Sequence, residues 1–279
     1  MYIDGFAKVN NTNLYYEMTG EGDAIFLLHS GLTDLRQWDD QFDFLGKHFR
    51  VIRYDIRGFG RSDRPNEAFS HFEDLKALFD YLNIKKAHLI GVSMGGSIAI
   101  DFTLQYPELV KSLILSGPSL SGYDFTVDHE SKLRSLAVMS IARRDKDFNK
   151  SVEFMLDNPM WRQNNPKARE CLKNMFLDTS LEWALEDIEN TVNPPASERL
   201  MEISKKILLI IGSEDSQPIK EVAGVLESNI PTVNKVVIKN TGHLPNLDKP
   251  NEFNQIILEF LNSIPGIQCH SKPGRYYEH

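Results

Sequence analysis

The chain has 279 residues, of which 41% are hydrophobic and 25% are charged, as is usual for globular proteins. Its net charge of −8 argues against nucleic-acid partners and anionic membranes, because both require basic surfaces. No run of about 18 apolar residues occurs, and the first residues lack the basic start and apolar stretch of a signal peptide. We therefore expect a cytoplasmic protein with no membrane partner, whose oligomeric state the sequence does not indicate.

Strand and helix patterns alternate along most of the chain. Residues 2–9 and 13–18, separated by Asn10-Asn11-Thr12, have the pattern of a β-hairpin. Apolar runs typical of strands buried on both faces follow at residues 24–28, 51–54, 88–90, 112–115, 207–211 and 235–238. Helical patterns lie between these runs, for example at residues 72–82 and 253–261. The alternation predicts an α/β fold, with a mostly parallel, doubly wound sheet of about eight strands.

The alternation stops after residue 119. Helical periodicity continues to about residue 204 without strands, and it involves three groups of apolar residues: Leu133, Leu136, Ala137 and Ile141; Ala168, Leu172, Met175 and Phe176; and Leu181, Ala184, Leu185 and Ile188. We expect residues 120–204 to form a helical cap, inserted after the fifth parallel strand. The core would then comprise residues 1–119 and 205–264, with residues 265–279 as a loosely held tail.

Residues 91–95, Gly-Val-Ser-Met-Gly, lie between a strand pattern and a helical pattern. A G-x-S-x-G in this position is typical of the nucleophile elbow, a sharp turn that lifts a serine clear of the sheet. The N-terminus of the following helix also points N–H groups at negative charge that develops beside it. Ser93 is therefore a candidate nucleophile. A serine needs a base, an acid that orients the base, and an oxyanion site.

An acid and a base follow the last two strand patterns. Asp215 comes directly after residues 207–211, and His243 comes directly after residues 235–238. Active-site groups gather at the carboxyl ends of the strands in open α/β sheets, so both are well placed. Glu214 competes with Asp215 as the acid, but the spacing after the preceding strand favours Asp215.

Two backbone N–H groups are candidates for the oxyanion site. One belongs to Met94, the residue after the nucleophile. The other belongs to Leu32, in the turn that follows the strand at residues 24–28. His29, at the start of that turn, is expected to order it through hydrogen bonds rather than to transfer protons.

With these motifs the chain resembles the α/β-hydrolase superfamily, in its subgroup of small esterases, lactonases and related enzymes. The order Ser93, Asp215, His243 is that of this superfamily. Within it the chain is similar to the enol-lactone hydrolases of aromatic catabolism, which share its Trp-Asp-x-Gln and R-G-F/H-G-x-S patterns. The matching motifs run in order from about residue 24 to 262: His29-Ser30-Gly31 with Trp38 downstream, residues 55–63, 91–96 and 212–215, and Gly242-His243 followed by Pro250 and Phe253. The resemblance implies an α/β-hydrolase fold with an inserted helical cap.

The sequence departs from the family pattern in places. The first turn reads His-Ser-Gly where many relatives have His-Gly, and the segment between residues 63 and 72 is short. Leu244 follows His243, whereas relatives that cleave carbon–carbon bonds often carry Trp there.

Three classes of function remain open. The first is a metal-free and cofactor-free serine hydrolase that cleaves a small, largely apolar carboxylic ester or lactone through an acyl-enzyme. The second is another reaction by the same residues, such as carbon–carbon or amide hydrolysis, or peroxide-dependent halogenation or perhydrolysis. The third is a non-enzymatic ligand sensor. In the first reading the cap covers Ser93, and Met160 and Trp161 are candidate substrate contacts. Packing within the cap is the preferred role for its methionine and aromatic side chains in general.

Overall fold

The computed structural model of the protein describes residues 2–123, 148–158, 160–179, 183 and 188–267. Its centre is an eight-stranded sheet with the order β1-β2-β4-β3-β5-β6-β7-β8. Strands β3 to β8 run parallel, whereas β1 and β2 are antiparallel at one edge. The strands are β1 (Tyr2–Val9), β2 (Thr12–Thr19), β3 (Ala24–Leu28), β4 (Arg50–Tyr54), β5 (Ala87–Val92), β6 (Val110–Ser116), β7 (Ile207–Gly212) and β8 (Val233–Ile238).

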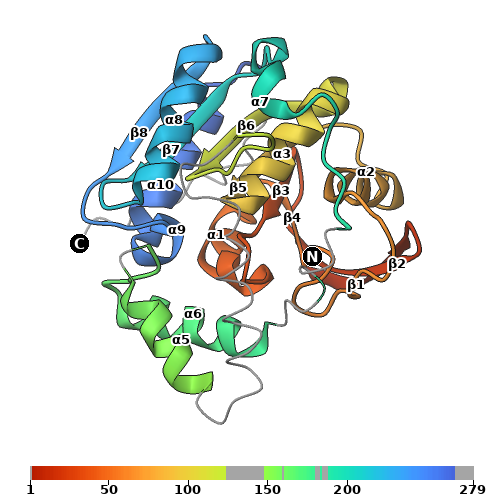
Figure 1. Cartoon of the computed structure of the whole chain (residues 1–279). Coiled ribbons are helices and arrows are strands. Elements are labelled where there is room, and N and C mark those ends of the chain that lie inside the picture. Colours follow the sequence, from red (N-terminus) through yellow and green to blue (C-terminus); the bar gives the residue numbers. More distant parts are fainter. Residues whose placement is uncertain (1, 124–147, 159, 180–182, 184–187, 268–279) are drawn as a thin grey trace, which may run out of the picture.

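Helices cover both faces of this sheet (Figure 1). The α-helices are α1 (Asp39–Leu45), α2 (His71–Tyr81), α3 (Met94–Gln105), α5 (Phe148–Asp157), α6 (Pro166–Asp178), α7 (Ala196–Arg199), α8 (Gln217–Asn229), α9 (Pro245–Asp248) and α10 (Pro250–Asn262). Short 3-10 helices are η1 (Leu35–Trp38), η2 (Pro107–Leu109) and η4 (Leu200–Glu202). Among the described residues, no helix is long and apolar enough to cross a membrane, and no three metal-ligating side chains come together.

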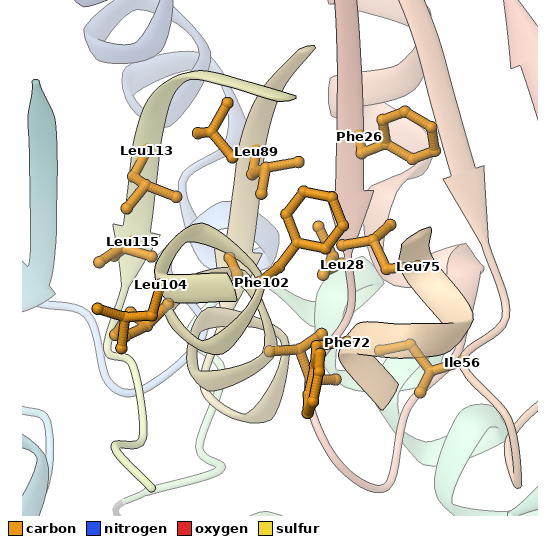
Figure 2. Close-up of a cluster of buried hydrophobic side chains, with 14 of the residues drawn as sticks. Phe26, Leu28, Ile56, Phe72, Leu75, Leu89, Phe102, Leu104, Leu113 and Leu115 are labelled. Atoms are coloured by element: carbon orange, nitrogen blue, oxygen red, sulfur yellow. The ribbon is translucent and has the colours of Figure 1, made fainter. Parts of the chain in front are cut away.

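Alternate residues of each central strand point to opposite hydrophobic cores. On one face, Phe26 of β3 stacks on Phe79 of α2 with ring centroids 4.3 Å apart. Figure 2 shows this cluster, in which side chains of β3, β5 and β6 meet those of α2 and α3. On the other face, Ile25 and Leu27 of the same strand belong to the core formed with α1 and α10. Burial on both sides explains why these strands are continuous apolar runs in the sequence.

The predicted strands are present at their predicted places. Strand β3 has the expected bounds, and the other parallel strands extend one to three residues beyond the expected runs. The N-terminal hairpin also forms, with Val9 paired to Thr12. Asn10 and Asn11 have φ of 43° and 56°, as the two central residues of a type I′ hairpin turn require.

The segment expected to be a cap divides into two parts where it is described. Helices α5 and α6 lie side by side beyond one end of the sheet, and α6 contacts η1, which follows β3 (Figure 1). The much shorter α7 packs on α3 of the core instead. These helices follow β6, the fourth parallel strand of the chain, so the expected insertion after a fifth strand is wrong. The structure does not describe several of the periodic residues, namely Leu133, Leu136, Ala137, Ile141, Leu181, Ala184 and Leu185.

Candidate active site

The candidate nucleophile occupies a strained turn between β5 and α3. Ser93 has φ 53° and ψ −115°, a conformation that L-residues rarely adopt. Its N–H donates to Ser116 O at the end of β6, at 3.0 Å. The glycines on either side are required by space: a Cβ on Gly91 would lie 2.3 Å from Gly95 O, and one on Gly95 would lie 2.2 Å from Leu28 O. This close approach accounts for the glycines of the pentapeptide.

The candidate acid and base form a buried pair. His243 Nδ1 lies 3.1 Å from each carboxylate oxygen of Asp215, and both side chains are fully buried. The carboxylate also accepts a bond of 2.7 Å from the Ser216 N–H, at the start of α8, where the helix dipole favours negative charge. Because Nδ1–H donates to the carboxylate, Nε2 of the neutral ring carries a lone pair. This Nε2 is buried and has no hydrogen-bond partner among the described residues.

Glu214, the competing acid, has a different partner from Asp215. Its exposed carboxylate forms an ion pair of 2.9 Å with Arg162. Two consecutive residues therefore have different partners: the carboxylate of Asp215 binds the imidazole, and that of Glu214 binds a surface arginine. Asp215 therefore lies against His243, and its role as the acid stays a prediction.

Gly117 lies between the elbow and the acid–base pair, and no sequence motif indicated a role for it. It directly follows Ser116, and its φ is 48°, in the left-handed region. A Cβ at this position would lie 2.9 Å from Asp215 Oδ2 and 3.1 Å from His243 Nδ1. The available signal was a glycine at the carboxyl end of an apolar strand.

The two candidate oxyanion donors come from neighbouring segments. A Cβ on Gly31 would lie 3.9 Å from Met94 Sδ, so the turn after β3 lies against the start of α3. Met94 is the first residue of α3, where a backbone N–H has no acceptor within the helix. Leu32 has φ 68°, a strained conformation for a branched residue, and its carbonyl accepts a 2.9 Å hydrogen bond from Thr179 Oγ1. Their role as oxyanion donors stays a prediction.

His29 stabilises this turn through both ring nitrogens. Its Nδ1–H donates to Ser30 O at 2.8 Å, and its Nε2 accepts from the Ile56 N–H at 2.9 Å. Burial lowers the pKa of His29 to about 4, so the ring is neutral at neutral pH. Both nitrogens are occupied by backbone groups, which suits a structural role better than proton transfer.

Residues 23–250 match the family model described as the alpha/beta hydrolase fold. The chain belongs to the α/β-hydrolase fold family. The parallel sheet and the elbow between β5 and α3 are the architecture that this family uses to present a nucleophile.

Relatives of this α/β-hydrolase are named as different kinds of hydrolase. A 2-hydroxy-6-oxononadienedioate/2-hydroxy-6-oxononatrienedioate hydrolase of Comamonas testosteroni is 29% identical over 91% of this chain and 92% of its own. A thermophilic esterase from Thermogutta terrifontis is 26% identical, with a TM-score of 0.79, over 94% of this chain and 99% of its own. The enol-lactonase from Burkholderia xenovorans LB400 shares the fold, with a TM-score of 0.77 and 24% identity, over 92% of this chain and 100% of its own. The family and these relatives identify the chain as a hydrolase.

The two predicted substrate contacts of this hydrolase lie against the candidate base. Met160 O accepts a hydrogen bond of 3.2 Å from the His243 N–H. The Trp161 ring meets the imidazole edge to face, with centroids 5.6 Å apart. Both residues are half-buried, and whether they also contact substrate stays a prediction.

Proposed function

We propose that this α/β-hydrolase is a serine hydrolase that cleaves a small, largely apolar carboxylic ester or lactone, by a mechanism that needs no metal or cofactor. The observation that carries the proposal is the buried His243–Asp215 pair, with Nδ1 bound to the carboxylate and Nε2 without a partner among the described residues. A base in this state can accept the proton of Ser93. The turn that carries Ser93, at the end of β5, is joined to the end of β6 by the hydrogen bond from the Ser93 N–H to Ser116 O.

In the first half of the proposed reaction, Ser93 Oγ attacks the substrate carbonyl carbon while His243 Nε2 takes its proton. Asp215 holds the ring in the required tautomer and stabilises the imidazolium. The Met94 and Leu32 N–H groups donate to the oxyanion. When the intermediate collapses, the ester C–O bond breaks and Nε2 gives its proton to the leaving alcohol. A lactone retains that alcohol on the acyl group.

In the second half, water attacks the acyl-enzyme. His243 Nε2 takes a proton from the water, and the oxyanion donors act again. Collapse breaks the bond between Ser93 Oγ and the acyl carbon, and Nε2 returns the proton to Ser93. The products are a carboxylic acid and the regenerated enzyme.

The preference for a small apolar substrate is supported by the position of α5 and α6. Parallel sheets bind ligands at the carboxyl ends of their strands, and the segment between these two helices contacts His243 there. Trp161 packs on Phe176 of α6 with centroids 5.3 Å apart, so this part of the covering layer is apolar. An apolar cover over a nucleophile favours small acyl groups over polymers.

Carbon–carbon hydrolysis is the second candidate function, and the observation that favours it is the similarity to the Comamonas relative. That protein is named as a 2-hydroxy-6-oxononadienedioate/2-hydroxy-6-oxononatrienedioate hydrolase and aligns over 91% of this chain. Against it stands Leu244, which is fully buried in this structure and occupies the position where such relatives often have Trp.

Turnover assays on purified protein test the proposal. p-Nitrophenyl esters of increasing acyl length, a small lactone and a 2-hydroxy-6-oxo dienoate should be compared for wild type and Ser93→Ala. We expect ester and lactone turnover that falls on the order of 10⁶-fold in kcat in Ser93→Ala, because the nucleophile is lost. A fluorophosphonate should label the wild type at Ser93 alone.

Three kinds of result would contradict the proposal. Full activity of Ser93→Ala, or labelling at another residue, would remove Ser93 as the nucleophile. Efficient cleavage of the dienoate with no ester or lactone turnover would establish the carbon–carbon alternative instead. No turnover of any of these substrates by a protein that still binds them would favour a ligand sensor.

A further inference from the structure

One stretch of the cap, residues 160–165, lies on the loop that carries the base. Met160 O accepts from the backbone N–H of His243 at 3.2 Å. The next residue, Trp161, meets the imidazole edge to face, with an interplanar angle of 84° and centroids 5.6 Å apart. The backbone and the ring of His243 are therefore both contacted by adjacent residues of the cap.

The same stretch has two further attachments, both after Trp161 in the chain. Arg162 pairs with Glu214, the neighbour of Asp215. Asp248 of α9 accepts the N–H groups of Asn164 and Asn165 at 2.7 and 2.8 Å. Asp248 also accepts the Asn164 side-chain amide at 2.9 Å, and its carboxylate is almost fully buried. A buried carboxylate with three donors fixes the backbone that it binds.

These attachments restrict a tilt of the His243 ring that its contact with Asp215 does not prevent. The carboxylate holds Nδ1 through both oxygens, but a ring held at one atom can still tilt and carry Nε2 away from the nucleophile. Trp161 blocks that tilt by contact with the ring. It is itself held against Phe176 of α6, at 5.3 Å and 89°.

We propose that residues 160–165 position the catalytic base, with Trp161 as the residue that sets the direction of His243 Nε2. This inference rests on the proposed function, in which His243 is the base. Trp161 acts through the imidazole and is a positioning residue. The cap thereby serves the chemical step as well as covering the substrate.

Positioning and substrate contact give different kinetic results. A misdirected base lowers kcat by the same factor for every acyl length and leaves KM unchanged. It also slows the reaction of Ser93 with a small fluorophosphonate, because that reaction needs the same base. Loss of a substrate contact changes KM and depends on acyl length, and it leaves fluorophosphonate labelling intact.

The experiment compares Trp161→Leu and Trp161→Phe with wild type across the p-nitrophenyl ester series and in fluorophosphonate labelling. Trp161→Leu should lower kcat and the labelling rate in parallel by about 10–100-fold, as expected for a misaligned catalytic group. Trp161→Phe keeps an aromatic ring at the position and should recover most of both rates. Asp248→Asn replaces one acceptor oxygen with an NH2 group and so loses at least one of the three hydrogen bonds. It should give the same pattern with a smaller factor.

Arg169→Gln is the matched control. Arg169 pairs with Glu153 and Asp157 inside the cap, so its loss loosens the cap without removing a contact to the loop of His243. We expect wild-type kcat and labelling from it, and thermal unfolding shows whether each variant is folded. If Trp161→Leu does not fold, Trp161→Phe and Asp248→Asn carry the test.

Three outcomes overturn the inference. They are a Trp161→Leu effect that varies with acyl length while labelling is unchanged, an Arg169→Gln effect equal to that of Trp161→Leu, and wild-type rates in Trp161→Leu. Failure of the proposed function is recognised separately, because Ser93 would then not be labelled in the wild type.

Discussion

Gly117 is the residue at which the end of β6 comes close to the acid–base pair. A methyl group there would lie 2.9 Å from Asp215 Oδ2, in a backbone with φ 48°. We predict that Gly117→Ala moves the carboxylate and the imidazole apart and lowers kcat by at least about tenfold, with a strain cost of about 1–3 kcal/mol. Ester kinetics and thermal unfolding measure the two effects.

Gly224→Ala is the control for this prediction. Gly224 lies within α8, and a Cβ there would have no atom within 4 Å. Alanine is the better helix former, so this variant should be unchanged in activity and more stable by about 0.5–1 kcal/mol. If Gly117→Ala retained full activity, the close packing of Gly117 against the pair would have no role in catalysis.

Asp215 and Glu214 are adjacent carboxylates with different partners, which makes them a matched pair for mutation. Asp215→Asn should lower kcat by about 10⁴-fold, because an amide favours the wrong tautomer of His243. Glu214→Gln should have a far smaller effect, since its partner is the exposed Arg162. The kcat of the two variants on one ester decides the assignment. A reversed order of effects would make Glu214 the acid.

At the scale of single elements, buried strands and hairpin turns could be predicted because their sequences follow from simple rules. β3 is apolar throughout because its two faces meet two cores, and Asn10-Asn11 tolerates positive φ at the hairpin turn. Asp215 and His243 could be placed because each follows such a strand. Their separation of 3.1 Å could not be predicted, since it depends on Gly117 and on the packing of β6.

His88 is a titratable residue inside one of these strands, β5. Its Nδ1 lies 2.7 Å from Ser112 Oγ, its Nε2 has no partner among the described residues, and the ring is fully buried. Burial lowers the pKa of His88 from 6.5 to about 4. The unfolded chain therefore binds a proton between these two values that the folded chain does not bind. Stability is lost as the pH falls through this window.

We predict that replacing His88 reduces the acid sensitivity of the fold. Relative to neutral pH, protonation of His88 in the unfolded state should contribute about 2 kcal/mol of destabilisation at about pH 5. His88→Gln should be less stable than wild type at neutral pH but should lose about 2 kcal/mol less on acidification. Urea unfolding at both pH values measures the difference. The same pH dependence in both proteins would show that His88 does not titrate in this way.

At the scale of the whole molecule, the relation of the cap to the core was the least predictable feature. The sequence indicated helices between residues 120 and 204 and a place above Ser93. It did not indicate which cap residues would meet the base, because the contact from Met160 is made by a backbone carbonyl and leaves no pattern. Nor did it indicate that α7 would pack on α3, while α5 and α6 pack on each other.

The position of Met160 beside His243 leads to a prediction about substrate choice. A flexible side chain on a residue whose backbone binds the loop of the base can limit the space for an acyl group, and its removal should enlarge that space. We expect Met160→Ala to shift the preferred p-nitrophenyl ester toward longer acyl chains while fluorophosphonate labelling of Ser93 stays at the wild-type rate. Met201→Ala is the control, because Met201 is 85% exposed in η4. An unchanged acyl preference in Met160→Ala would assign Met160 to the packing of the cap, with substrate choice determined elsewhere.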